Sequence, residues 1–283
     1  QDNDVFNMPF YTAAHEVSHY WWGHRVDPAN VDGGKVVTEA MAEYLAMRVL
    51  EEKFGRVPLT GFRKKMHRIY LRERARKGGE QPLVFAKDQQ EYLTYRKGGL
   101  AMYGLSVYWG EEELNTALAA YERKHRWAEP PYPTSLSFID HLAEAIPDSL
   151  AYLLDDYFRT ITLYDNSIRA FETLALEGNL FETKVDFSIS KYQADANGKK
   201  SFSSSSEKQM QESEKQSLPL NDYIQIGFYH SSSDAEPTQI KMIKVDQIEN
   251  ELRFELPFAP QRVEIDPLQL LFEEDRLDNV KVE

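Results

Sequence analysis

The segment His15-Glu16-Val17-Ser18-His19 carries two imidazoles one helical turn apart with a carboxylate between them. Residues four apart on a helix lie on the same face, with Cβ atoms about 5 to 6 Å apart. His15 and His19 can therefore direct one ring nitrogen each at the same metal ion. Glu16 lies one position further round the helix, where it can act on a water molecule rather than bind the metal. The spacing predicts a zinc site that hydrolyses peptide bonds.

A third ligand is expected from the segment 38–46, which reads as a helix with carboxylates at Glu39 and Glu43. Catalytic zinc commonly takes two histidines and one glutamate from the protein and leaves its fourth position to water. We expect Glu39 to be the ligand because it begins the helix on the metal side, with Glu43 as the alternative. The second N–H of a zinc-bound histidine needs an acceptor. The sequence offers Asp27, Asp32 and Glu43 for this role without selecting one.

The five other histidines are not expected to bind metal. A lone histidine is usually a core or surface residue with a hydrogen bond. We expect this of His24, His67, His125, His141 and His230. A short motif also arises by chance, so the zinc interpretation depends on further motifs downstream.

Three separated motifs follow one another in a specific order: Trp21-Trp22-Gly23, Thr38-Glu39-Ala40-Met41-Ala42 and Tyr95-Arg96-Lys97-Gly98-Gly99. With the histidine segment they resemble the zinc aminopeptidases of the aminopeptidase N family, which are gluzincins. That family has His-Glu-x-x-His, a Trp-Phe-Gly run, a glutamate in an Asn-Glu-Gly-Phe-Ala-like segment and a Tyr-x-Lys-Gly segment. The nearest likeness is to peptidase modules that some bacteria carry behind a membrane permease. The motifs and helical pattern extend the resemblance over roughly residues 8–175.

The resemblance implies one Zn²⁺ per chain held by His15, His19 and Glu39, with Glu16 as general base. It implies that Tyr95 stabilises the oxyanion, whereas by position alone Tyr95 would be an ordinary buried tyrosine. The implied fold is α+β and multidomain: the helical C-terminal part of a thermolysin-like zinc peptidase domain plus a helical bundle, followed by a β-sandwich-like domain. A peptide substrate and an extracytoplasmic or periplasmic place in a bacterial membrane protein are implied as well.

Two departures from the family pattern bear on activity. Residues 20–38, between His19 and Glu39, are one more than the family usually has, and we place the extra residue in the Asp32-Gly33-Gly34 turn. The Gly-x-Met-Glu-Asn motif, which holds the substrate's free amino end in the family, would lie upstream of the zinc helix. We therefore expect a C-terminal fragment of a larger protein with weak or no activity in isolation. An endopeptidase and a catalytically inactive peptidase-fold binding module of a membrane transporter-associated protein remain alternatives.

Composition narrows the class of protein. A chain of 283 residues with 42% hydrophobic residues can form the cores of one large or two ordinary domains. The formal net charge of −13 disfavours nucleic acid and anionic membrane surfaces as partners. The absence of cysteine excludes disulfides and a thiolate zinc site. No apolar run is long enough for a transmembrane helix, so we expect membrane contact only through segments outside this chain.

The pattern of apolar residues predicts two regions. Residues 1–178 read as a helical zinc-peptidase region, with motif helices in 9–55 and a helical bundle in 56–178. Residues 179–283 are rich in β-branched and aromatic residues and predict an immunoglobulin-like sandwich. Within the second region, the segment 194–217 is too polar to bury and is expected to be a mobile loop.

Overall fold

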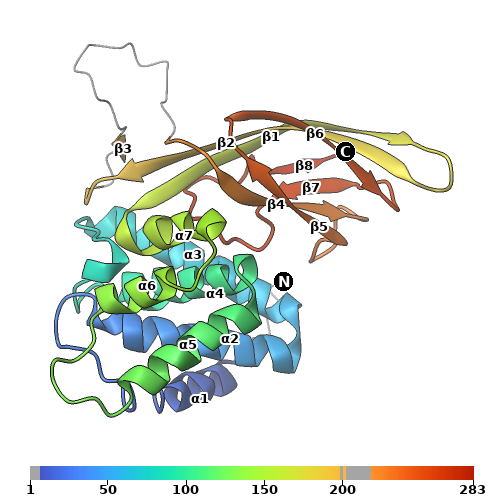
Figure 1. Ribbon diagram of the computed structural model, residues 1–283. Coiled ribbons are helices and arrows are strands. Elements are labelled where there is room, and N and C mark those ends of the chain that lie inside the picture. Colours follow the sequence, from blue (N-terminus) through green and yellow to red (C-terminus); the bar gives the residue numbers. More distant parts are fainter. Residues whose placement is uncertain (1–6, 198–199, 202–217) are drawn as a thin grey trace, which may run out of the picture. The chain divides into compact units, whose positions relative to one another are not determined.

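The computed structural model describes residues 7–197, 200–201 and 218–283. Its internal contacts divide the chain into two compact units. The first comprises the residues up to Ile161 together with a short segment that begins at Asp195, and the second comprises the rest of the chain from Thr162. The first unit is helical and the second carries the strands (Figure 1).

Within the described residues, the first unit contains seven α-helices: α1 (Met8–Ser18), α2 (Met41–Phe54), α3 (Arg56–Lys77), α4 (Gly98–Tyr108), α5 (Glu111–His125), α6 (Ser135–Ala143) and α7 (Tyr152–Leu154). Between them lie the π-helical segments η1 (Val36–Ala40), η3 (Tyr92–Lys97) and η5 (Asp155–Arg159) and the 3₁₀ turns η2 (Leu83–Phe85) and η4 (Asp148–Leu150). η1 continues directly into α2, and η3 continues directly into α4.

The core of this unit lies around α4, which is apolar on all sides and buried along almost its whole length. α1 and α3 both contact α2, and α2 contacts α4. The face of α3 that carries Leu59, Phe62, Met66 and Tyr70 is buried, at the spacing of an amphipathic helix. These contacts bring the histidines of α1 close to the carboxylates at the start of α2.

Two glycines allow the start of α4 to approach η1 and α2 closely. A Cβ atom at Gly98 would lie 2.6 Å from the Cβ of Ala40, and one at Gly99 would lie 2.7 Å from the Cβ of Glu43. Separations this short are well inside carbon–carbon contact distance. The glycine pair therefore sets how closely η3, the segment before α4, can lie to Glu39.

The second unit consists of two antiparallel sheets. Its strands are β1 (Thr162–Ala175), β2 (Phe181–Ala194), β3 (Lys200–Ser201), β4 (Asp222–Tyr229), β5 (Gln239–Val245), β6 (Glu249–Leu256), β7 (Arg262–Ile265) and β8 (Val280–Val282). One sheet has the order β1-β2-β3 with β6 also paired to β2, and the other has the order β5-β4-β7-β8. Side chains of both sheets, such as Phe187 from β2 and Ile226 from β4, share one buried cluster. This is the packing of a sandwich.

The fold is thus mixed helix and sheet, as expected for an α+β chain, but the predicted boundary at residue 178 is wrong. Thr162–Ala175, which the sequence analysis placed with the helices, is strand β1 and pairs with β2 along its length. Every second residue of this stretch, Tyr164, Asn166 and Ile168, is buried. Because Asn166 is polar, the alternation of apolar and polar residues that indicates a strand is interrupted in the sequence. Most of the segment 194–217, predicted to be a mobile loop, lies outside the described residues.

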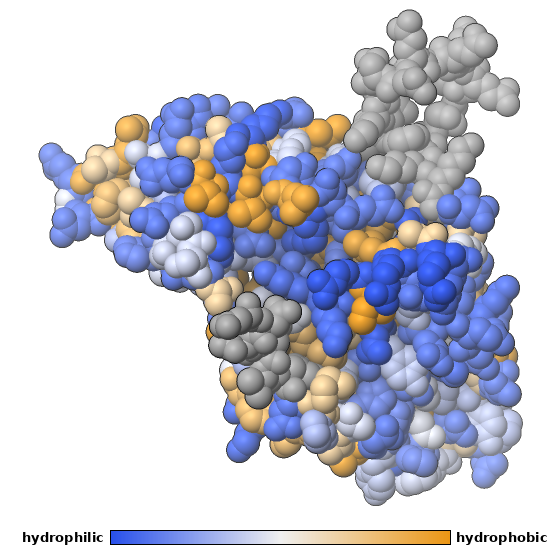
Figure 2. All heavy atoms as spheres, turned by 180° about the vertical axis from the view of Figure 1, so that it is seen from behind, coloured by the Kyte–Doolittle hydropathy of each residue, from blue (hydrophilic) through white to orange (hydrophobic). Residues whose placement is uncertain are grey.

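One face of the molecule is mainly polar. In the view of Figure 2 most of the visible face is hydrophilic, with smaller groups of hydrophobic side chains between. Within the part of the chain that the structure describes, no helix combines the length and the apolar character needed to cross a bilayer.

The second unit contains a fully buried carboxylate, Glu273. It accepts hydrogen bonds from the backbone and side-chain N–H groups of Asn166 and from the side-chain amide of Asn279. Arg276 Nη1 lies 3.4 Å from its Oε2. Burial nevertheless raises the pKa of Glu273 to about 7, and the neighbouring carboxylate of Asp266 adds to the rise.

This raised pKa predicts that the second unit loses stability as pH rises. The folded state binds the proton of Glu273 up to about pH 7, whereas the unfolded chain releases it near the ordinary glutamate pKa of 4.5. The stabilisation is complete below pH 4.5 and is lost as pH rises through 7, by roughly 3 kcal/mol at most. Hydrogen exchange of β4 amides should therefore show wild type losing protection relative to Glu273→Gln between pH 5 and pH 8. A difference between the two proteins that stays constant with pH would contradict this.

Candidate metal centre

α1 directs His15 and His19 to one side. The helix begins after Asn7, whose side chain accepts the backbone N–H of Phe10 at 3.1 Å, and Pro9 occupies its first turn. The helix ends at Ser18, but His19 keeps right-handed helical dihedrals of φ −61° and ψ −17°. Its side chain therefore continues the face of His15, and the two Nε2 atoms lie 3.2 Å apart.

Glu39 completes the group from η1. Its Oε2 lies 3.3 Å from His15 Nε2 and 3.4 Å from His19 Nε2. A tetrahedral zinc ion at about 2.0 to 2.2 Å from each ligand separates the ligand atoms by roughly 3.3 to 3.6 Å. The three atoms are therefore already close to the spacing of a zinc site. Among the residues that the structure describes, these three alone form a group of histidine and acidic side chains close enough to hold one ion.

The polar atoms of this group fit a cation. Glu39 Oε2 is buried and has no hydrogen-bond partner, which is costly for a carboxylate oxygen. Burial acts to raise the pKa of Glu39, but the neighbouring His15 ring, the Tyr95 hydroxyl and the imidazole charges hold it below its usual value. A charged carboxylate facing two imidazole nitrogens is a typical donor set for zinc.

The outer nitrogens of both rings face acceptors. His19 Nδ1 lies 3.0 Å from the backbone carbonyl oxygen of Trp22, and His15 Nδ1 lies 3.5 Å from Glu43 Oε1. A proton on Nδ1 leaves the Nε2 lone pair of each ring directed at the shared centre. Of the three acidic residues offered by the sequence, the structure brings Glu43 to this outer position. It also shows the Trp22 carbonyl, which no side-chain pattern could indicate.

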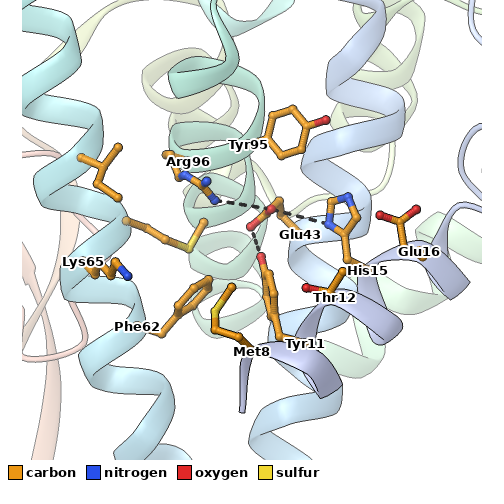
Figure 3. Close-up of a pocket in the computed structure, with 12 residues that line it drawn as sticks. Met8, Tyr11, Thr12, His15, Glu16, Glu43, Phe62, Lys65, Tyr95 and Arg96 are labelled. Atoms are coloured by element: carbon orange, nitrogen blue, oxygen red, sulfur yellow. Dashed lines mark hydrogen bonds and ion pairs between the residues drawn. The ribbon is translucent and has the colours of Figure 1, made fainter. Parts of the chain in front are cut away.

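Glu43 lies in a buried cluster beside the centre (Figure 3). Tyr11 donates its hydroxyl hydrogen bond to Glu43 Oε2, and Arg96 Nη1 lies 3.6 Å from Glu43 Oε1. Burial raises the pKa of Glu43 above its ordinary value, although the Tyr11 hydroxyl and the Arg96 charge act to lower it. Glu43, predicted as the alternative ligand, is not part of the group of three.

Tyr95 faces the centre from η3. Its ring stacks on the His15 ring with centroids 5.8 Å apart and an interplanar angle of 11°. Burial and the Glu39 carboxylate raise the pKa of Tyr95 well above its ordinary value, so the phenol keeps its proton and can donate it in a hydrogen bond.

Lys97 of the same segment does not join the metal centre. Its Nζ donates a hydrogen bond to Glu80 Oε1 at 3.0 Å in the interior. Lys97 anchors the segment that carries Tyr95.

Glu16 is exposed on α1 beside His15 and lines a cavity of about 260 Å³ (Figure 3). The wall of this cavity is mostly apolar, with Phe62 and Met66 of α3 among its residues. Lys65 and Arg96 add positive charge to it. The cavity could not be predicted from the sequence, because its lining comes from four separate segments, α1, α2, α3 and η3.

The five other histidines lie outside this group. His141 Nε2 lies 3.0 Å from the carbonyl oxygen of Ala117, and His67 is buried on α3. Both have the structural role that is usual for a lone histidine.

Glu39 and Tyr95 share a local feature, since each lies in a π-helical segment. A π-helical turn takes one residue more than an α-helical turn, and such turns are frequent at functional sites. η1 is therefore a second place, besides the Asp32-Gly33-Gly34 turn, where the extra residue between His19 and Glu39 can be accommodated.

No protein-family model matches the sequence, and no curated protein matches it either. Among solved structures, aminopeptidase A of Legionella pneumophila in complex with aspartic acid aligns over 94% of this chain, with a TM-score of 0.53 and 18% identity. The chain has a peptidase-like fold. It spans only 27% of the length of that aminopeptidase. An M1 zinc metallopeptidase mutant from Deinococcus radiodurans, bound to the substrate Tyr-Ser-Ala, aligns over 52% of this chain and 32% of its own, with a TM-score of 0.43 and 16% identity.

Proposed function

We propose that this chain is the metal-binding part of a zinc-dependent metallopeptidase that acts as an aminopeptidase on peptides. The observation that carries the proposal is the triangle of His15 Nε2, His19 Nε2 and Glu39 Oε2, whose sides of 3.2 to 3.4 Å suit one zinc ion. The fold shared with aminopeptidase A supports the same class of enzyme.

In the proposed peptide-bond hydrolysis, the zinc ligands, Glu16 and Tyr95 have separate roles. Zinc held by His15, His19 and Glu39 would lower the pKa of a bound water toward about 7 and polarise the scissile carbonyl. Glu16 lies beside His15, where its carboxylate can accept the proton of the attacking water and deliver it to the leaving amine. Tyr95, protonated and stacked on His15, can donate a hydrogen bond to the oxygen on which charge develops. One such donor is worth about 3 kcal/mol of barrier.

The cavity beside the metal centre can hold one side chain of the substrate. Its volume of about 260 Å³ suffices for one amino-acid side chain, and it opens beside His15 and Glu16. A residue flanking the scissile bond can therefore be held by apolar contact with Phe62 and Met66 while its backbone lies at the metal.

The proposal is tested by metal content and by substrate choice. We expect one zinc ion per chain by elemental analysis, and hydrolysis of aminoacyl-fluorophores but not of N-blocked peptides by the natural full-length protein. Cleavage of blocked peptides would indicate an endopeptidase instead. Zinc binding without turnover would indicate an inactive binding module, and a well-folded protein that takes up no zinc would overturn the metallopeptidase assignment.

A further inference from the structure

We propose that Glu43 is a positioning residue that orients His15 for zinc, and that Tyr11 and Arg96 hold the Glu43 carboxylate for that purpose. This inference rests on the proposed zinc site. It concerns side chains that do not belong to the ligand group, and its test measures metal affinity rather than turnover.

The first observation is the environment of the outer nitrogen of His15. His15 Nδ1 is buried and has no hydrogen-bond partner, and the nearest acceptor is Glu43 Oε1 at 3.5 Å. This separation is slightly longer than a normal N–H···O hydrogen bond. A small rotation of the His15 ring would close it. Zinc-bound histidines almost always donate this N–H to a carboxylate, a carbonyl or water.

The second observation is that both oxygens of Glu43 are held by other groups. Oε2 accepts the hydroxyl of Tyr11, and Oε1 lies 3.6 Å from Arg96 Nη1 as well as near His15. Glu43 is only 2% exposed and forms part of the wall of the cavity beside the centre. The carboxylate therefore has one fixed orientation, in which Oε1 faces the His15 ring (Figure 3).

The third observation is where the three partners come from. Tyr11 lies on α1, which carries His15 and is capped by His19, and Arg96 follows Tyr95 on η3. Glu43 lies on α2, four residues after Glu39 of the preceding segment η1. The Tyr11–Glu43–Arg96 cluster thus joins the three elements that supply the centre. A substitution in this cluster should therefore change the zinc affinity by altering the orientation of His15.

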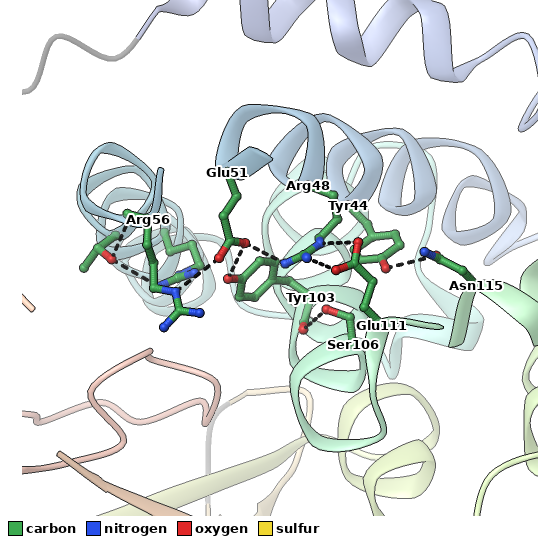
Figure 4. A network of polar contacts seen from close by, with 10 residues as sticks. Tyr44, Arg48, Glu51, Arg56, Tyr103, Ser106, Glu111 and Asn115 are labelled. Carbon is green, nitrogen blue, oxygen red and sulfur yellow. Dashed lines mark hydrogen bonds and ion pairs between the residues drawn. The ribbon is translucent and has the colours of Figure 1, made fainter. Parts of the chain in front are cut away.

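The chain offers a matched control on the same helix. Glu51 of α2 also accepts a tyrosine hydroxyl and arginine N–H groups: Tyr103 Oη lies 2.8 Å, and Arg48 Nη1 2.6 Å, from its Oε2 (Figure 4). Arg56 Nε lies 3.2 Å from Glu51 Oε1. Within the described residues, the hydrogen bonds and ion pairs of Glu51 reach Arg48, Arg56 and Tyr103 and neither histidine of the centre. The same substitution there therefore removes the same kind of cluster without touching the ligands.

The experiment compares the zinc dissociation constants of metal-free proteins by competition with a chelator. We expect Glu43→Gln to weaken zinc binding about 10- to 100-fold. Tyr11→Phe, which removes only the hydroxyl that holds Glu43, should weaken it in the same direction by a smaller factor. Glu51→Gln and Tyr103→Phe should bind zinc as the wild type does. Cobalt-loaded Glu43→Gln should also show a changed visible spectrum, because the His15 ligand is reoriented.

Each possible result of the zinc-binding comparison either supports or overturns the positioning role of Glu43. Circular dichroism of the metal-free variants shows whether they are folded, and if Glu43→Gln is not, Tyr11→Phe carries the decision. Wild-type affinity in a folded Glu43→Gln, or equal losses in the Glu43 and Glu51 variants, would overturn the positioning role while leaving the zinc site intact. Failure of the wild type itself to bind zinc would overturn both proposals, and that result is seen before any variant is compared.

Discussion

His19→Ala is expected to abolish stoichiometric zinc binding by this chain. The variant leaves His15 Nε2 and Glu39 Oε2 as the remaining two atoms of the triangle. Two ligands cannot close the site, so the loss should exceed the about 10- to 100-fold that removal of an outer partner costs. Elemental analysis after dialysis and chelator competition measure the effect.

Zinc should also stabilise the folded wild type and not this variant. A ligand that binds only the folded state adds about 2.7 kcal/mol at a concentration one hundred times its dissociation constant. The rise in melting temperature with added zinc should therefore vanish in His19→Ala. His141→Ala is the control, because His141 bonds the Ala117 carbonyl and lies outside the ligand group. Unchanged zinc affinity in His19→Ala would show that the three side chains do not form a metal site.

Glu16→Gln is expected to reduce peptide hydrolysis by about 10²- to 10⁴-fold and to leave zinc content unchanged. Glutamine has nearly the shape of glutamate but cannot take a proton from water. Glu16 is exposed beside His15 and is not one of the three grouped ligands, so the metal site should survive the change. Initial rates and zinc stoichiometry should be measured together on the natural full-length protein.

Glu52→Gln, an exposed glutamate of α2, serves as the control and should keep wild-type rates. If zinc content falls together with activity in Glu16→Gln, then Glu16 supports the metal and is not the general base. If the rate stays within a few-fold of wild type, another group accepts the proton.

The local parts of the centre could be predicted from the sequence. Helical spacing alone brings His15 and His19 to one face, because the geometry of one turn does not depend on the rest of the fold. Glu39 Oε2 lies within 3.4 Å of both imidazole nitrogens, and its role as the third ligand stays a prediction. Tyr95 was selected by its motif and lies against His15. The roles of these residues as ligands and catalytic groups remain predictions that the experiments above test.

The contacts between elements could not be predicted. Which acidic residue faces His15 Nδ1 depends on the register of α1 against α2, and hydrophobic periodicity does not specify that register. Arg96 belongs to a motif, but only the folded chain shows that its guanidinium lies beside Glu43. Likewise, β1 is a strand because β2 pairs with it, and its own polar residues conceal the alternation.

The π-helical form of η1 gives this part of the chain a tolerance for length. A π-helical turn holds one residue more than an α-helical turn, so η1 can take up the extra residue that lies between His19 and Glu39. The Glu39 carboxylate still lies within 3.4 Å of both imidazole nitrogens, and α2 begins directly after η1. An insertion can therefore be absorbed in the backbone of a single turn while the acidic group stays beside the two rings.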